Sequence, residues 1–166
     1  MHTVYLALGS NIGNRHDNLC AALSMIENQI GHIMLQSDFI TTAPQGFDSP
    51  NQFLNMVLCL HSNLTPTQIL DITQDIERQL GRNHKSTNGI YHDRTIDIDI
   101  LLYDDLHIKS PRLTIPHPRM THRTFVMQPL SQIAPNLIIP GETQTTTQLL
   151  TQLNTTHKCQ TDAQPQ

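Results

Sequence analysis

Two aspartates stand at alternate positions of an otherwise aliphatic run, RTIDIDILLY, which begins at Arg94. Successive side chains of a strand point to opposite faces, so Asp97 and Asp99 would share one face, with Cα atoms about 6.6 Å apart. Like charges this close repel each other unless a cation lies between them. Mg²⁺ prefers carboxylate oxygens and needs few protein ligands. The spacing therefore fits two Mg²⁺ ions serving displacement at phosphorus. The polar face of an amphipathic strand explains the two residues alone equally well.

Positively charged side chains flank the aspartates in the sequence. Arg94 lies just upstream of the pair. The polar loop before it and the stretch after the strand supply further candidate cations, namely Arg82, His84, Lys85, Arg112, His117 and Arg123. Proline on both sides of His117 fixes the backbone there, which suits an imidazole aimed at an anion. These nearby basic residues favour a phosphate-binding role for the aspartates over a strand face that is simply exposed to solvent.

An amide and two aromatic residues indicate a pocket for a flat heterocycle. Asn55 lies inside the apolar run FLNMVLCL, where an amide is costly unless it is hydrogen-bonded. Phe53 and Phe125 would provide faces for stacking, although both also fit a plain core. The loop 9–14, GSNIGN, lacks the ending of a P-loop and the spacing of a dinucleotide fingerprint. It is either a simple turn or a small flexible loop beside a substrate pocket.

The pattern of apolar residues predicts alternating strands and helices. Strands are predicted at 3–8, 32–40, 53–61 and the aspartate-bearing stretch, and helices at 17–29, 66–80, 120–128 and 146–153. The run Thr65-Pro66-Thr67-Gln68 has the form of a capping box with proline at the first helical position. The order β-α-β-β-α-β predicts an α+β fold with a ferredoxin-like split βαβ core, in which helices pack on a mainly antiparallel sheet. The alternative is another α+β arrangement of the same elements.

Length and composition indicate an ordinary globular chain. Its 166 residues fit one domain, expected at 1–154, and the polar segment 155–166 is expected to be a disordered tail. The net charge of -4 argues against nucleic acid as a partner. Three cysteines without CxxC spacing suggest neither a disulfide framework nor a zinc site. No segment is apolar enough for a membrane span, and a cytoplasmic monomer with small-molecule substrates is expected.

Several motifs together resemble one known family. GSNIGN, then TAPQG with FLN, then RTIDIDILLY, and finally LTIPHPRM with Arg123 and Phe125 occur in the order and spacing of hydroxymethyl-dihydropterin pyrophosphokinases, over residues 3–140. Members of this family move a pyrophosphoryl group from ATP to a pterin alcohol in folate biosynthesis. The resemblance implies a ferredoxin-like fold with flexible loops that close over both substrates.

The resemblance also assigns roles to residues of this chain. Two Mg²⁺ ions would be held by Asp97 and Asp99, which would act in catalysis together with Arg82 and Arg94. The implied ATP contacts are Leu70, Gln74, Glu77, Arg94, Ile100, Arg112, Thr114, His117 and Arg123. The implied pterin contacts are Thr42, Ala43, Pro44, Gly46, Phe53, Asn55 and Phe125.

The chain departs from the family pattern at a few positions. Many relatives have Trp-Gly-Pro-Arg before the paired aspartates, whereas this chain has Tyr91-His92-Asp93-Arg94. Tyr91 is a candidate replacement for the stacking aromatic residue. His84 stands where relatives often carry a second arginine, and Pro118 where some have tyrosine. Two other functions are compatible with parts of the pattern: a non-catalytic regulatory module, and a metal-dependent nuclease, against which the acidic net charge counts.

Overall fold

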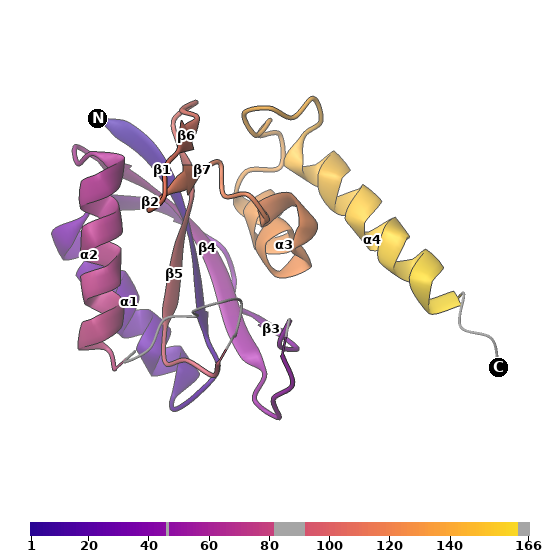
Figure 1. The fold of residues 1–166 in the computed structure, drawn as a ribbon, viewed down its shortest axis with the longest axis horizontal. Helices are drawn as coiled ribbons and strands as arrows, with labels where there is room; N and C mark the ends of the chain where they lie inside the picture. The colour runs from indigo at the N-terminus through magenta and orange to yellow at the C-terminus, as the bar shows by residue number, and fades with distance from the viewer. Residues whose placement is uncertain (46, 82–91, 163–166) are drawn as a thin grey trace.

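An antiparallel sheet forms the centre of the computed structural model, which describes residues 1–45, 47–81 and 92–162 (Figure 1). Its strands are β1 (His2–Ser10), β2 (His32–Gln36), β3 (Ile40–Thr42), β4 (Phe53–Ser62) and β5 (Asp97–Tyr103). The order across the sheet is β2-β4-β1-β5, and β3 pairs with β4 beyond the end of β2. Strands from the two halves of the chain thus alternate, which confirms the predicted split βαβ arrangement.

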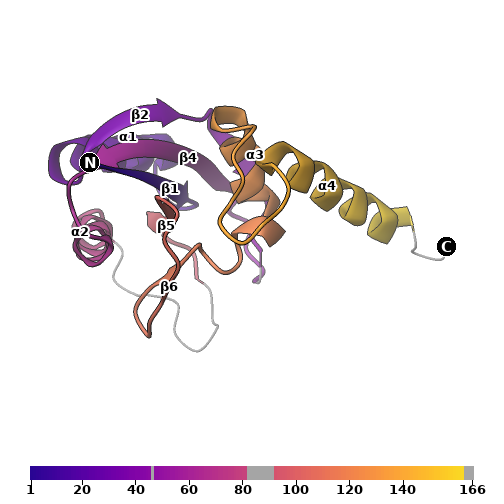
Figure 2. The same cartoon turned by 90° about the horizontal axis from the view of Figure 1, so that it is seen from above.

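Helices cover both faces of the sheet (Figures 1 and 2). On one face lie α1 (Arg15–Gln29) and α2 (Pro66–Gln79), and on the other lies α3 (Thr124–Ile133), against which α4 (Thr146–Asp162) packs. A hairpin of β6 (Ile108–Lys109) and β7 (Thr114–Ile115) and a 3₁₀ turn, η1 (Met120–His122), join β5 to α3. Among the described residues no helix has the length and apolarity needed to cross a membrane.

Local signals set where the first two helices begin. The Asn14 side chain accepts the Asp17 N–H at 3.1 Å and starts α1. At the start of α2 the predicted capping box is confirmed: Thr65 Oγ1 accepts the Gln68 N–H at 3.3 Å, and Gln68 Oε1 accepts the Thr65 N–H at 2.8 Å. Both caps satisfy backbone donors that a helix leaves unpaired at its first turn.

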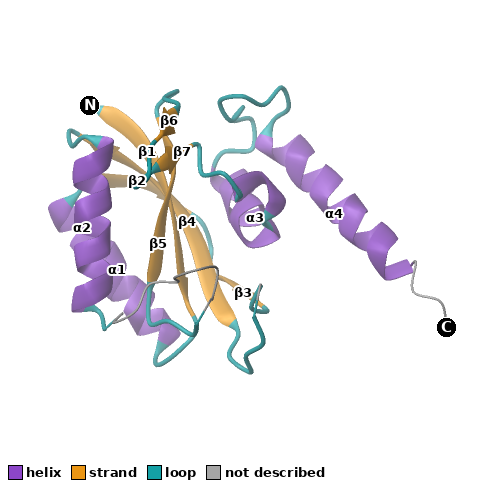
Figure 3. Ribbon diagram, in the orientation of Figure 1, coloured by secondary structure: helices purple, strands orange, loops and turns teal. Residues whose placement is uncertain are grey.

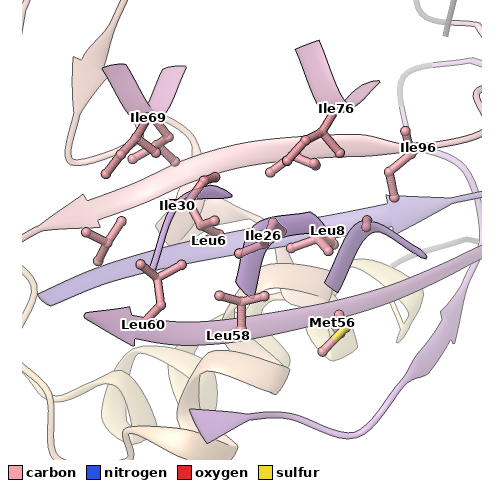
Figure 4. Close-up of a cluster of buried hydrophobic side chains, with 14 of the residues drawn as sticks. Leu6, Leu8, Ile26, Ile30, Met56, Leu58, Leu60, Ile69, Ile76 and Ile96 are labelled. Atoms are coloured by element: carbon pink, nitrogen blue, oxygen red, sulfur yellow. The ribbon is translucent and has the colours of Figure 1, made fainter. Parts of the chain in front are cut away.

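The main core lies between the sheet and the α1/α2 layer. Figure 4 shows side chains of these elements meeting there, among them Leu6, Leu8, Ile26, Leu58, Ile69 and Ile76. A second core on the opposite face joins Val57 and Leu101 to Val126, Met127 and Leu130 of α3. Full burial of one such side chain contributes about 1.5–3 kcal/mol. Because helices pack on both faces of the sheet, β1, β4 and β5 form a packed support for the side chains that they carry.

Three regions differ from the sequence-based expectations. The predicted helix 120–128 is divided into η1 and α3, because Arg123 between them has an extended backbone (φ -112°, ψ 108°). The short strand β3 and the β6–β7 hairpin were not predicted. The last helix continues to Asp162, beyond the end predicted at residue 153, and residues 163–166 lie outside the described residues.

Candidate active site

The aspartate pair lies on one face of β5, as its alternation predicted. In the β1–β5 register Asp97 stands opposite Gly9 and Asp99 opposite Ala7. Opposed residues of an antiparallel pair project to the same face. The two carboxylates therefore rise beside two of the smallest side chains, which leave open space next to them. Loops that follow β1, precede β4 and lead into β5 gather at this end of the sheet (Figure 3).

A cavity of about 780 Å³ surrounds this edge of the sheet. It brings together most of the residues that the sequence singled out: Thr42, Ala43, Phe53, Asn55, Leu70, Gln74, Glu77, Arg94, Asp97, Asp99, Ile100, Arg112, Thr114, His117, Arg123 and Phe125. Pro44 does not line the cavity. Gly46, Arg82, His84, Lys85 and Tyr91 lie outside the described residues. The residues in this list therefore line one cavity, and their contacts with substrates remain predictions.

The sequence pointed to no role for several residues of the cavity wall. These are Ala7, Leu8, Ile98, Ser110, Pro111, Leu113, Arg119 and His122. Gly9, Gln45 and Pro118 also line the cavity, and they belong to stretches that the sequence singled out without a role for these individual residues. Small residues such as Gly9 become visible as a floor only once the register of β1 against β5 is known. Arg119 and His122 could have been proposed from the sequence, since both are basic residues within the stretch that contains His117 and Arg123.

Each aspartate has an arginine beside it. The Arg94 Nη1 donates to Asp97 Oδ2 at 3.4 Å, and Arg123 Nη1 lies 4.0 Å from Asp99 Oδ2. The pKa of Asp99 is raised to about 7, mainly by burial and then by the negative charge of Asp97, with a smaller contribution from Glu77, while Arg123 and Arg94 lower it. With Glu77 included, three carboxylates face these two guanidinium groups in the cavity, which leaves room for an additional cation.

Glu77 joins α2 to the aspartate strand. Its side chain is buried, with a residue exposure of 4%. Its Oε1 accepts the backbone N–H of Ile98 at 2.8 Å. Since β5 is an edge strand, this outward N–H has no further strand to pair with, and the carboxylate takes that place. Glu77 is therefore engaged with the strand backbone while it lines the cavity.

Aromatic rings and an amide form the opposite part of the cavity. Asn55 Nδ2 donates to Thr42 Oγ1 at 2.7 Å, and Asn55 is only 6% exposed. The Arg94 guanidinium carbon lies 5.3 Å from the centre of the Phe53 ring. The corresponding distance from Arg123 to Phe125 is 5.5 Å. A planar ligand in this region would meet two aromatic faces and one fixed amide.

His117 is a neutral hydrogen-bond donor in this setting. Burial lowers the pKa of its imidazole to about 4, with the positive charge of Arg123 as the next cause. Its Nδ1 accepts the Arg119 backbone N–H at 3.2 Å, so the proton of the neutral ring resides on Nε2. The backbone N–H of His117 donates to the Leu101 carbonyl at 2.9 Å, and this bond holds the His117 backbone against β5. This backbone hydrogen bond adds to the restriction expected from the prolines on both sides of His117.

Comparison with known proteins places the chain in a family. A family model described as 7,8-dihydro-6-hydroxymethylpterin-pyrophosphokinase (HPPK) matches residues 5–135. The chain belongs to this family. A Porphyromonas gingivalis HPPK, named 2-amino-4-hydroxy-6-hydroxymethyldihydropteridine pyrophosphokinase, is 54% identical over 136 residues, which cover 81% of this chain and 92% of the relative. A Bacillus subtilis HPPK of the same name is 39% identical over 130 residues, covering 78% and 76%.

The fold also matches a solved HPPK structure. A Plasmodium falciparum HPPK-DHPS crystal structure superposes with a TM-score of 0.81 over 96% of this chain, at 16% sequence identity. This chain spans 44% of the length of that protein. At such low identity the likeness supports the fold alone. It agrees with the α+β architecture predicted for an HPPK chain.

The donor set at the HPPK aspartates fits magnesium. The described residues contain no group of three or more His, Cys, Asp or Glu side chains able to hold a metal ion. Mg²⁺ does not need such a group, since it is usually bound through one or two carboxylates, substrate phosphates and water. Asp97 and Asp99 supply two carboxylates, and together with Glu77 they outnumber the two arginines beside the pair. The residues present therefore suit Mg²⁺ bound together with a phosphate substrate.

Proposed function

We propose that this protein transfers a pyrophosphoryl group from ATP to the hydroxymethyl oxygen of 6-hydroxymethyl-7,8-dihydropterin, with AMP as the second product, as a step of tetrahydrofolate biosynthesis. Membership of the HPPK family supports this reaction. The single geometric observation that carries it is the aspartate pair on an open floor, facing an amide and aromatic rings within one cavity. One cavity thus offers a polar half for a triphosphate and a flat, apolar half for a pterin.

The pterin side of the reaction rests on residues of β3, β4 and α3. Phe53 and Phe125 would sandwich the ring system, and Asn55 would read its polar edge while Thr42 holds the amide in place. Ala43, Pro44 and Gly46 complete the proposed pterin contacts. Fixing the ring aims the hydroxymethyl oxygen at the β-phosphorus. A bond then forms between these two atoms, and the bond from the β-phosphorus to the oxygen that AMP keeps is broken.

The ATP side rests on the aspartates and the cations around them. Asp97 and Asp99 would hold two Mg²⁺ ions, which supply positive charge to the phosphates and the attacking oxygen. Arg94 and Arg123 already lie beside these carboxylates and would turn to phosphate oxygens. His117 would donate its Nε2 proton as a neutral group. Positioning and charge neutralisation supply most of the rate in such transfers.

The remaining proposed ATP contacts lie on α2, on β5 and in the β6–β7 hairpin. They are Leu70, Gln74, Glu77, Ile100, Arg112 and Thr114. Arg82 is proposed as a catalytic residue and lies outside the described residues. Arg112 forms an exposed ion pair with Asp71 of α2 at 2.5 Å. An exposed pair of this kind contributes little to stability, so exchanging it for a nucleotide contact costs little.

The reaction is tested by the nucleotide product. The protein is incubated with ATP, Mg²⁺ and the reduced pterin alcohol, and AMP and ADP are quantified. AMP formed in equal amount to the pterin diphosphate supports the proposal, whereas ADP indicates an ordinary kinase. If the protein bound a metabolite tightly but formed no product, a regulatory module would be favoured. Cleavage of an oligonucleotide would favour a metal-dependent nuclease.

A cytoplasmic monomer without nucleic-acid or membrane partners completes the proposal. The net charge of -4 supports the absence of nucleic-acid binding. Sedimentation at two protein concentrations tests the monomer directly, and a concentration-dependent increase in mass would contradict it.

A further inference from the structure

Asp93 connects two loops that are distant in sequence. Its Oδ1 accepts from Asn11 Nδ2 at 2.7 Å, and its Oδ2 accepts from Asn51 Nδ2 at 2.8 Å. Ser49 is a further donor to the same carboxylate, and these hydrogen bonds hold the pKa of Asp93 below its usual value. Asn11 belongs to the loop after β1, and Ser49 and Asn51 belong to the loop before β4. Asp93 therefore ties both loops to the segment that leads into β5.

Asn11 carries this connection to the main chain of Arg94. Its Oδ1 accepts the Arg94 N–H at 2.7 Å, and its own N–H donates to the Arg94 carbonyl at 3.1 Å. Asn11 is 2% exposed, so both bonds are shielded from water. One buried side chain thus bonds to the Asp93 carboxylate and also to the backbone of the next residue. The backbone of Arg94 is held on both sides.

Arg94 links the two halves of the cavity. Its guanidinium group lies against Asp97 on the metal side and over Phe53 on the pterin side, and its side chain is 12% exposed. A small displacement of its backbone would change both contacts, since they depend on one long side chain.

We infer that Asp93, acting through Asn11, is a positioning residue that fixes Arg94 between the aspartate pair and the pterin-binding ring. This inference rests on the role proposed above for Arg94. Asp93 itself touches neither substrate in this assignment. Its effect on the reaction passes entirely through the placement of Arg94.

The positioning is tested first without any substrate. Asp93→Ala removes an acceptor for three donors, and Asp93→Asn keeps the size but replaces one acceptor oxygen by a donor. Asp48→Ala is the matched control, because Asp48 is an exposed aspartate in the loop before β4 that no described hydrogen bond involves. Hydrogen exchange at the Arg94 amide should accelerate at least about tenfold in Asp93→Ala, less in Asp93→Asn, and stay unchanged in Asp48→Ala. Unchanged protection in both Asp93 variants would overturn the inference.

A double-mutant cycle tests whether Asp93 acts through Arg94. With the wild-type arginine, Asp93→Ala should lower kcat by about 10- to 100-fold and change KM for the pterin by less than about threefold. In an Arg94→Ala background the same substitution should change kcat by less than about twofold. Additive losses would mean a general structural role and would overturn the inference. If the wild-type protein released no AMP, the proposed reaction would fail, and exchange at the Arg94 amide would still decide whether Asp93 positions this residue.

Discussion

The Glu77 carboxylate accepts the backbone N–H of Ile98, the residue between the two aspartates, at 2.8 Å. A helix on one layer of the molecule thus holds the edge strand at the point where the strand carries its chemistry. The bond fixes the position of the Asp97 and Asp99 backbone relative to α2. It also brings a third carboxylate near the pair, where its charge helps to raise the pKa of Asp99.

Removing this carboxylate should destabilise the protein. Glu77→Ala leaves the Ile98 N–H buried without its acceptor, which should lower the free energy of unfolding by about 1–3 kcal/mol. Glu77→Gln keeps an acceptor oxygen and should cost less. Urea denaturation of the three proteins measures the difference. Equal midpoints for Glu77→Ala and the wild type would show that the bond does not hold the strand.

The floor of the cavity should tolerate nothing larger than glycine at position 9. A Cβ on Gly9 would lie 2.6 Å from Asn55 Oδ1 and 3.5 Å from the Phe53 ring, so the amide must move. Gly9→Ala and Asn55→Ala should each weaken pterin binding by about tenfold or more, with ATP binding changed by less than about twofold. Calorimetry with each ligand measures both effects.

A combined variant provides the control for this prediction. In the Asn55→Ala background the obstructed amide is absent, so Gly9→Ala should cost much less further pterin affinity than it does alone. Equal losses for ATP and pterin in Asn55→Ala would reject the assignment of this residue to the pterin half.

His117 should titrate far below an ordinary histidine. Its pKa is lowered from 6.5 to about 4, so it is neutral at pH 7. In the unfolded chain the imidazole binds its proton more readily, and its contribution to stability is present above about pH 6.5 and lost as pH falls through 4. An NMR titration of the ring without ATP should give a midpoint near 4, moving upward when the triphosphate binds. A midpoint at or above 6.5 in the ligand-free protein would contradict this.

Asp99 should have the opposite pH dependence. Its pKa is raised from 3.8 to about 7, so the folded state binds more protons than the unfolded chain between these values. Its contribution to stability is therefore present below about pH 4 and is lost as pH rises through 7. Metal-free unfolding at pH 4 and pH 8, compared with Asp99→Asn, measures this contribution. A variant with the same pH dependence as the wild type would show that Asp99 is not the group responsible.

Patterns confined to neighbouring residues predicted most of the fold. The capping box at Thr65 and Gln68, the alternation around Asp97 and the helical spacing in α1 and α2 each depend on contacts within a few residues. The end of α4 was not predictable in the same way. Its last turns, from Thr155 onward, have a polar sequence without an apolar stripe, so hydrophobic periodicity has nothing to detect.

The sequence predicted many of the polar residues of the candidate site, but not how the strands and helices that carry them lie against one another. Asp97, Asn55 and Arg94 stand out because charged or amide groups are unusual beside buried strands. The family resemblance named Glu77 as an ATP contact. Its bond to the Ile98 N–H and the place of Gly9 in the cavity floor were not predicted, because they depend on β5 being the sheet edge and on the register of β1 against β5. Those are relations between segments far apart in the chain, which no local pattern encodes.

The most direct test of the account is turnover in Asp97→Ala and Asp99→Ala at saturating magnesium, with circular dichroism recorded on the same samples. Both side chains are partly exposed on the cavity face of β5, whereas the strand's isoleucines carry the packing. Each variant should therefore keep the wild-type spectrum and lose AMP release by at least about 10²-fold. Wild-type rates in either folded variant would contradict the claim that these two carboxylates hold the metal ions of the reaction.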